Sequence, residues 1–249
     1  MLSTALAVFL GFRNSQVYDR WWEARQLWGT LVNYSRSFAR QLLTFTAGKD
    51  LASHAQVKSM IYRHIAFVYA LKAHLRLQPQ TEFTQFLDAE GQTLAKGKDN
   101  LPNYLLLLQS RELAELKNES GLPDMLFVQI DQALVQFHQV QGGCERIKNT
   151  PFPRQYNYFT KLFVHLHGLL LPFAFVKDLW LLTIPVSVAL SFVFMSLDKI
   201  STRLENPFEN RINDVPMNAI SRTIEINLKE MLQEEKLPEK IGPVDGFLF

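Results

Sequence analysis

Apolar positions are concentrated in a few long runs, and the longest extends from Leu179 to Leu197 without a charged residue. A helix over these residues would be about 28 Å long, close to the roughly 30 Å thickness of a bilayer's hydrocarbon core. A shorter apolar run, Phe163 to Val176, precedes it, and Lys177-Asp178 separates the two. The pattern predicts a membrane-crossing helical hairpin with a tight polar turn and with Pro185 inside its second helix.

The first residues, Met1 to Phe12, form a third uncharged run. It is too short to cross a bilayer, and it lacks the basic leading region and the small-residue cleavage site of a signal peptide. We expect it to be the second half of a membrane helix that begins upstream of the chain. A large buried soluble core is the alternative for all three runs, but the length of the Leu179–Leu197 run favours membrane insertion.

The middle of the chain, from Asp50 to Ile147, has the apolar spacing of soluble helices. Pro102 is suited to the start of one helix, and Gly142 and Gly143 are expected to loosen the end of the next. The polar stretch from Leu87 to Asn103 is expected to be a connection. Three sets of apolar residues fit successive helices. They are Ile61, Ile65, Val68 and Leu71, then Leu105, Leu106, Leu107, Leu108, Leu113 and Leu116, then Leu126, Ile130, Leu134, Phe137 and Val140.

The C-terminal part combines an irregular polar segment, residues 203–218, with a last amphipathic helix that carries Ile220, Ile224, Leu228 and Leu232. We interpret Glu234 and Glu235 as the solvated end of this helix, and we expect the tail from Leu237 to be extended. No run alternates as a strand would, so the chain is predicted to be all-α. We divide it into residues 1–29 (pore-lining helix end and aromatic boundary), 30–150 (cytosolic helical region), 151–200 (membrane hairpin) and 201–249 (cytosolic C-terminal segment and helix).

Composition excludes several classes of function. Lys+Arg 26 against Asp+Glu 24 gives a net charge of +2, which offers no basic excess for nucleic acid. The single cysteine, Cys144, excludes a disulfide framework and a cysteine-based zinc site within one chain, and it reads as a packed thiol. His165 and His167 lie on different helix faces and make a poor metal pair, so we interpret them as packed or interfacial. Without a phosphate loop or a nucleophile elbow, we predict neither an enzyme nor a cofactor.

The most distinctive segment is Phe9 to Gly29, FLGFRNSQVYDRWWEARQLWG. Tryptophan rings mixed with paired charges are typical of a membrane–water boundary. An ordinary amphipathic helix with an aromatic core stripe is the alternative, and the segment alone does not decide between them. The residues of this boundary signature are Arg13, Asp19, Arg20, Trp21, Trp22, Glu23 and Trp28.

The same segment resembles the end of the pore helix in the bacterial branch of the bestrophin family of ion channels. The resemblance recurs in the same order along nearly the whole chain. Its further motifs are Cys144-Glu145-Arg146-Ile147, Thr150-Pro151-Phe152-Pro153, Leu171-Pro172-Phe173, Glu205-Asn206-Pro207-Phe208-Glu209 and Asn213-Asp214-Val215-Pro216.

This resemblance implies a homopentamer around a central pore, with four membrane helices per subunit and a large helical cytosolic part, in a bacterial inner membrane. The expected partners are further copies of the chain, lipid and small inorganic ions. Family members carry a membrane helix before the pore helix, which this chain is expected to lack. Animal members bind calcium through an acidic run, but here Arg211 and Ile212 interrupt the corresponding residues 209–214, so we do not expect calcium gating.

The family's pore neck is lined by three residues spaced by four, and the resemblance places them at Thr4, Val8 and Phe12. Five copies would stack these residues into three rings, of which the apolar ones would gate by dewetting, and Thr4 would make the first ring wetter. The sign of the conducted ion is not decided by Phe12, because the edge of its ring attracts anions and the face attracts cations. The resemblance to the family favours anions such as chloride. A non-conducting membrane-anchored helical scaffold or sensor is the alternative function.

Overall fold

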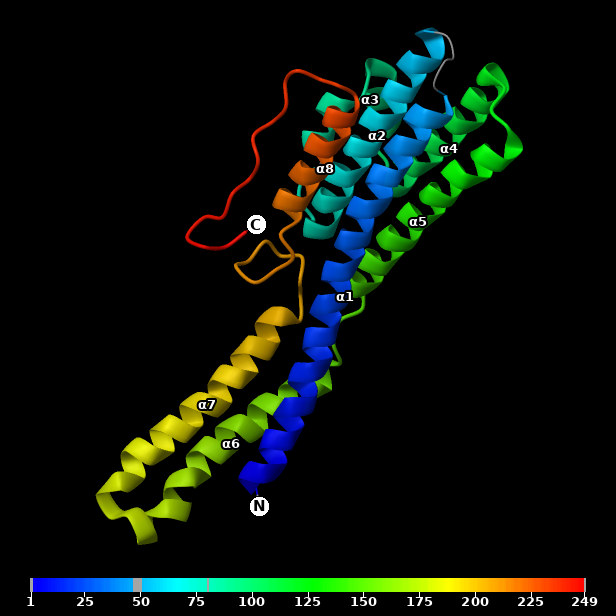
Figure 1. The fold of residues 1–249 in the computed structure, drawn as a ribbon. Coiled ribbons are helices and arrows are strands. Elements are labelled where there is room, and N and C mark those ends of the chain that lie inside the picture. The colour runs from blue at the N-terminus through cyan, green and yellow to red at the C-terminus, as the bar shows by residue number, and fades with distance from the viewer. Residues whose placement is uncertain (1, 47–50, 80, 249) are drawn as a thin grey trace. The chain divides into compact units, whose positions relative to one another are not determined.

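The computed structural model describes residues 2–46, 51–79 and 81–248, and helices dominate it (Figure 1). Within this part of the chain the only β pairing is an isolated bridge between Val244 and Phe247. The all-α class predicted from the sequence is confirmed. In chain order the elements are α1 (Leu2–Phe45), α2 (Leu51–Arg76), the 3₁₀ helix η1 (Glu82–Phe86), α3 (Ala89–Ala95), α4 (Leu101–Ser120), α5 (Asp124–Asn149), α6 (Arg154–Leu179), the 3₁₀ helix η2 (Trp180–Leu182), α7 (Thr183–Leu204) and α8 (Met217–Met231).

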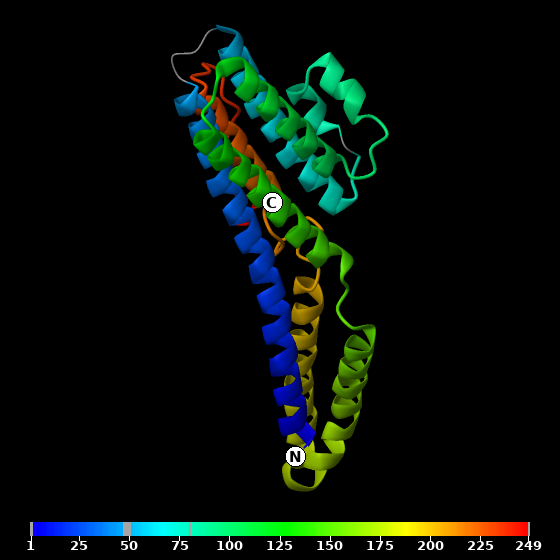
Figure 2. The same cartoon turned by 90° about the vertical axis from the view of Figure 1, so that its right-hand side faces the viewer.

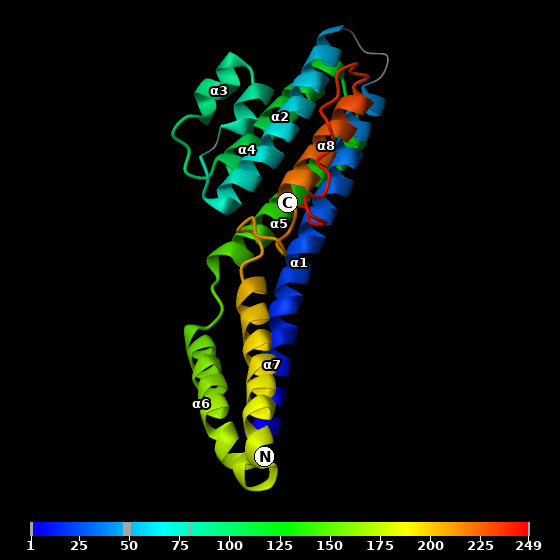
Figure 3. The same cartoon turned by 90° about the vertical axis from the view of Figure 1, so that its left-hand side faces the viewer.

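The chain forms two compact units. Unit 1 comprises Met1–Glu23 and Ile147–Pro207, and unit 2 comprises Ala24–Arg146 and Phe208–Phe249. Unit 1 therefore contains the beginning of α1 together with the α6–η2–α7 hairpin, whose two helices run in opposite directions in Figures 2 and 3. Unit 2 contains the remainder of α1 with α2, η1, α3, α4, α8 and most of α5.

The hairpin turn lies three residues later than the sequence predicts. Lys177 and Asp178 belong to the last turn of α6, and the chain reverses through η2, which begins at Trp180 with a φ of 46°. A positive φ ends an α-helix, whereas a lysine fits its last turn because its charge complements the carbonyl end. The prediction of a turn at Lys177-Asp178 is therefore wrong, and Pro185 lies in the first turn of α7, where its missing N–H costs no helical bond.

The hairpin is apolar and exposed. The described residues contain one stretch long and apolar enough to cross a membrane, Arg154–Leu204, which covers α6, η2 and α7. Only 11% of its most apolar window is buried. A helix in the core of a soluble protein would be mostly buried, so this exposure argues against the soluble-core alternative and for lipid or protein partners around the hairpin.

Unit 2 is built around α2, which is buried from His64 to Lys72. Its neighbours include α4, η1 and α8. An aromatic cluster in the core consists of Phe38, His64, Phe67 and Phe137, with the His64 and Phe137 ring centroids 4.2 Å apart. The predicted last helix is confirmed as α8, which buries Ile220, Ile224 and Leu228. The helix expected near Pro102 is α4.

The stretch from Leu87 to Asn103 was expected to be a connection, but it contains a short helix. The Asp88 side chain accepts a hydrogen bond from the Gly91 N–H at 2.8 Å and so caps the start of α3. Asn100 caps α4 in the same way, through the Asn103 N–H at 3.1 Å. Asp88 and Asn100 are residue types that are also common in loops, but here each caps the first turn of a helix.

Gly142 and Gly143 do not loosen α5, which continues through both to Asn149. A Cβ at Gly143 would approach Leu27 Cδ1 to 2.9 Å, whereas one at Gly142 would meet nothing within 4 Å. The absence of a side chain at Gly143 therefore serves close packing of α5 against Leu27 rather than flexibility.

Glu234 is not a solvated residue at a helix end, because it lies beyond α8 and has two partners. It accepts a hydrogen bond from Tyr62 Oη at 2.6 Å and pairs with Lys58 Nζ at 3.1 Å. Burial, with the neighbouring Glu234 carboxylate, raises the pKa of Tyr62 to about 12. Glu235 is exposed, as expected.

Candidate functional site

The candidate site begins on α1 within unit 1, where one side of the helix is packed and the other is open. Leu6 and Leu10 are 4% and 0% exposed and form a small core with Val164 of α6, against which Phe194 of α7 packs. Val8 and Phe12 are 54% and 65% exposed. At about 100° per residue, these two lie roughly opposite the packed leucines.

Thr4 is exposed like Val8 and Phe12, so all three residues assigned to the neck lie on the open side of α1. The spacing by four gives them one stripe along the helix. The small residues Ala5, Ala7 and Gly11 are also exposed, which lets another copy of the helix approach this side closely. The assignment of the neck to Thr4, Val8 and Phe12 stays a prediction.

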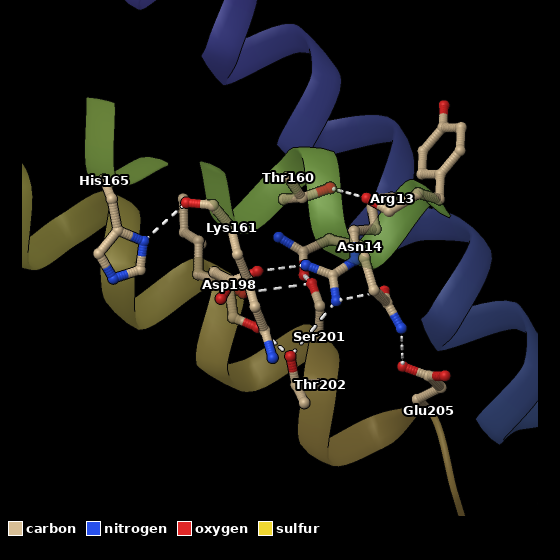
Figure 4. A network of polar contacts seen from close by, with 12 residues as sticks. Arg13, Asn14, Thr160, Lys161, His165, Asp198, Ser201, Thr202 and Glu205 are labelled. Carbon is tan, nitrogen blue, oxygen red and sulfur yellow. Dashed lines mark hydrogen bonds and ion pairs between the residues drawn. The ribbon is translucent and has the colours of Figure 1, made fainter. Parts of the chain in front are cut away.

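The first charged residue of α1 lies immediately after this stripe and points into the unit. Arg13 is 0% exposed and pairs with Asp198 of α7. Its second terminal nitrogen, Nη2, donates to Asn157 Oδ1 at 2.8 Å and to Thr202 Oγ1 at 3.3 Å. Figure 4 shows Arg13 close to Asp198 and Thr202. A buried guanidinium is stable only when paired and hydrogen-bonded, and this one has both kinds of partner.

The polar network extends along α7. Ser201 Oγ donates to Asn14 Oδ1, and Asn157 Nδ2 donates to Glu205 Oε2 at 2.9 Å. Asp198, Ser201, Thr202 and Glu205 recur at spacings of three and four and therefore share one side of α7. A polar side of α7 thus meets α1 where the apolar part of the hairpin ends.

Arg20 forms a second connection, from α1 to two backbone carbonyl groups. Its Nε donates to the Glu205 carbonyl at 2.9 Å, and its Nη2 donates to the Ile147 carbonyl. Both acceptors lie where a helix is close to its end, so the arginine satisfies carbonyls that the helix itself leaves open. Arg20 thereby fixes α1 to both ends of the hairpin segment.

The remaining residues of the boundary signature do not form one cluster. Trp21 and Trp22 lie beside Tyr18, with Tyr18 stacked on Trp22 at a centroid distance of 6.5 Å, and Trp22 is 46% exposed. Asp19 is exposed and Glu23 half-buried. Trp28, in contrast, is 0% exposed in the core of unit 2.

Sequence reasoning missed the partners of Arg13, namely Asn157, Asp198 and Thr202, and the neighbouring Ser201–Asn14 hydrogen bond. A signal existed, because Arg13 and Asp198 each end an apolar run, and each needs a counter-charge at that depth. Their separation by 185 positions gave no way to pair them before the fold was known.

The two histidines of α6 and Cys144 show no sign of ligand chemistry. His165 Nδ1 lies 2.6 Å from the Lys161 carbonyl, while His167 is 4% exposed with its ring edge against Phe194 at 5.0 Å. Cys144 is fully buried in unit 2, in agreement with a packed thiol. Among the described residues, no group of three His, Cys, Asp or Glu side chains is placed to hold a metal ion.

Residues 209–214, compared above with the calcium-binding run of animal members, contain a carboxylate that is hydrogen-bonded within its own loop. Asp214 is 6% exposed, and its Oδ2 accepts a hydrogen bond from the Arg211 N–H at 3.0 Å. Burial raises the pKa of Asp214. The side chains of Arg211 and Ile212 carry no oxygen, so neither adds a side-chain ligand to the loop.

The exposed apolar hairpin, with the exposed side of α1 in the same unit, is typical of an α-helical membrane protein. The chain matches the family described as "Bacterial/Fungal Bestrophin protein" over residues 1–230. It therefore belongs to the bestrophin family.

Named relatives and solved structures agree with this assignment. The chain is 38% identical to the voltage-dependent anion channel-forming protein YneE of Escherichia coli over 244 residues, which cover 98% of this chain and 79% of the relative. It is 30% identical over 250 residues to a voltage-dependent anion channel-forming protein of Mesorhizobium japonicum, covering 100% and 78%. A crystal structure of a bacterial bestrophin homologue from Klebsiella pneumoniae superposes with a TM-score of 0.89 at 37% identity, covering 94% of this chain and 86% of that one.

Proposed function

We propose that the chain is one subunit of a homopentameric channel in a bacterial inner membrane, and that the channel conducts small anions such as chloride. The names of the relatives, voltage-dependent anion channel-forming proteins, support the anion assignment. In this proposal unit 1 lies in the membrane and unit 2 in the cytosol.

The observation that carries the proposal is the open side of α1. Val8 and Phe12 are 54% and 65% exposed on a helix whose other side buries Leu6, Leu10 and Arg13. A few helices of one subunit cannot enclose a water-filled path, so a pore needs several copies. Five copies with this side turned to a common axis would line a pore with rings of Thr4, Val8 and Phe12.

Such a neck would select by dehydration. A narrow ring of valine and phenylalanine offers no polar atoms to replace an ion's water, so passage depends on how readily the ion sheds its hydration shell. The positive edge of the Phe12 ring can face an anion. The Thr4 hydroxyl would keep the neighbouring ring wetter. Weakly hydrated anions should therefore pass more easily than strongly hydrated ones.

The test is single-channel recording of the full-length protein in planar bilayers. Val8→Ala/Phe12→Ala should raise conductance markedly, because the apolar bulk that expels water is removed while alanine preserves the helix. The matched control, Leu10→Ala, shortens a residue on the packed side and should lower assembly or stability instead. Increased conductance in Leu10→Ala with no change in the double variant would show that the pore faces the Leu10 side of α1 and that the proposed side is wrong.

The same recordings separate a channel from a scaffold or sensor. A pentameric channel must show discrete current steps that depend on the inserted protein. A correctly inserted, stable oligomer without current at any voltage would contradict conduction and favour the non-conducting scaffold or sensor.

A further inference from the structure

A fully buried charge lies one residue beyond the proposed neck. Arg13 follows Phe12 directly and is 0% exposed, and its counter-ion Asp198 is 14% exposed. Ionisable residues at membrane depth are costly and are seldom retained for packing alone. Replacing a buried ion pair by apolar residues of similar volume is often neutral or stabilising, so packing does not account for this pair.

The pair lies close enough to the proposed pore to influence an ion electrostatically. Successive helix residues are about 100° apart, so Arg13 points away from Phe12 into the bundle, roughly one helix diameter of 10–12 Å from the open side. At an effective dielectric constant of about 20, one unit charge about 10 Å away changes ion occupancy by roughly tenfold. Five subunits would repeat this charge around the axis.

In the wild-type protein the charge is balanced. The Asp198 carboxylate neutralises the Arg13 guanidinium. Further along the helices, Arg20 bonds the Glu205 carbonyl, and the Glu205 carboxylate belongs to the polar network of Figure 4. A balanced pair adds little net field at the neck. Selection there is then left to dehydration rather than to charge.

We propose that the Arg13–Asp198 pair is a selectivity-determining element, because its balance keeps the neck close to electrically neutral. This inference rests on the proposed function. Loss of Asp198 would leave five arginines, which stay charged, and would favour anions more strongly. Loss of Arg13 would leave the carboxylates and shift permeability towards cations.

Each single substitution leaves one buried charge without its counter-charge and is expected to lower stability, but part of the hydrogen-bond network remains. In Asp198→Asn the guanidinium keeps its hydrogen bonds to Asn157 at 2.8 Å and Thr202 at 3.3 Å. In Arg13→Gln the shorter amide leaves Asn157 bonded to Glu205. The double variant Arg13→Gln/Asp198→Asn removes both charges and retains polar groups on both helices. Lys199→Gln is the matched control, because it removes one positive charge from an exposed position next to Asp198 on α7.

The experiment measures reversal potentials of the full-length channel in asymmetric potassium chloride. Because one charge changes in each of five subunits, Asp198→Asn should raise the chloride-to-potassium permeability ratio at least about tenfold. Arg13→Gln should lower the ratio at least about tenfold, and the double variant should return close to wild type. Lys199→Gln should leave the ratio unchanged. A purely structural clamp would lower the amount of assembled channel in both single variants without opposite shifts in ion sign.

The experiment distinguishes failure of this inference from failure of the channel proposal on which it rests. If the wild-type protein conducts and both single variants conduct with an unchanged ratio, or with shifts of the same sign, the inference is overturned. If a single variant does not assemble, the double variant and the other single variant still decide, because their predicted ratios differ at least about tenfold. If the wild-type oligomer itself carries no current, the channel proposal and the inference that rests on it both fail.

Discussion

His64 gives a pH-dependent stability that can be calculated from its surroundings. The ring is completely buried in unit 2 between Phe38, Phe67 and Phe137. The Ser35 hydroxyl donates to the Leu31 carbonyl at 2.6 Å, so it accepts from His64 Nε2 at 2.8 Å. Nε2 therefore carries the proton of a neutral ring, and burial lowers the pKa of His64 from 6.5 to about 3.

The lowered pKa of His64 determines how the stability of the fold changes with pH. Between its folded and unfolded pKa values, the histidine is neutral in the folded state and protonated in the unfolded state. Protons then favour unfolding, so the stability is complete above pH 6.5 and declines as the pH falls towards 3. At pH 5 the loss relative to pH 8 is about 2 kcal/mol, which corresponds to about 4–8 °C in melting temperature.

Thermal unfolding of the full-length protein in detergent, followed from pH 8 to pH 5, measures this effect. His64→Leu removes the titrating group but leaves the Ser35 hydroxyl its bond to Leu31. The fall in melting temperature from pH 8 to pH 5 should therefore be about 4–8 °C smaller in this variant than in the wild type. His54→Gln, which changes an exposed histidine of the same helix, should keep the wild-type slope. Equal slopes for wild type and His64→Leu would refute the argument.

Two further predictions concern packing and topology. Gly143→Leu should lower the melting temperature by several degrees because even its Cβ would lie 2.9 Å from Leu27 Cδ1; Leu27→Ala should restore part of the loss, and Gly142→Leu should have no such effect. In a background without the native cysteine, Lys177→Cys at the hairpin end should react with a membrane-impermeant thiol reagent only from outside the cell, and Lys98→Cys in unit 2 only from inside. Labelling of both from one side would contradict the proposed orientation.

The sequence was sufficient for the helices whose apolar spacing is regular. Ile220, Ile224 and Leu228 define α8, and the uncharged run to Leu197 defines most of α7, because burial and membrane insertion both act through side-chain polarity. The turn was misplaced because the sequence does not encode the positive φ of Trp180 in its polarity pattern. Asp88 was taken for a loop residue because capping residues and loop residues have the same composition.

The candidate site was only partly accessible from the sequence. The spacing of Thr4, Val8 and Phe12 is visible in one helix, and their placement at a neck remains a prediction. Contacts between distant segments were not visible, so Arg13 appeared only as a boundary charge until Asp198 was found beside it. Trp28 was grouped with Trp21 and Trp22 by proximity in sequence, although a helix continues past them into the core of unit 2.

The central claim is that this chain forms an anion channel, and the reversal potential of the purified wild-type protein in planar bilayers tests it most directly. With potassium chloride more concentrated on one side, a channel that prefers anions reverses close to the chloride equilibrium potential. Exchange of potassium for a large organic cation should leave that potential unchanged. Reversal close to the potassium equilibrium potential, or the absence of any protein-dependent current from an intact oligomer, would contradict the account.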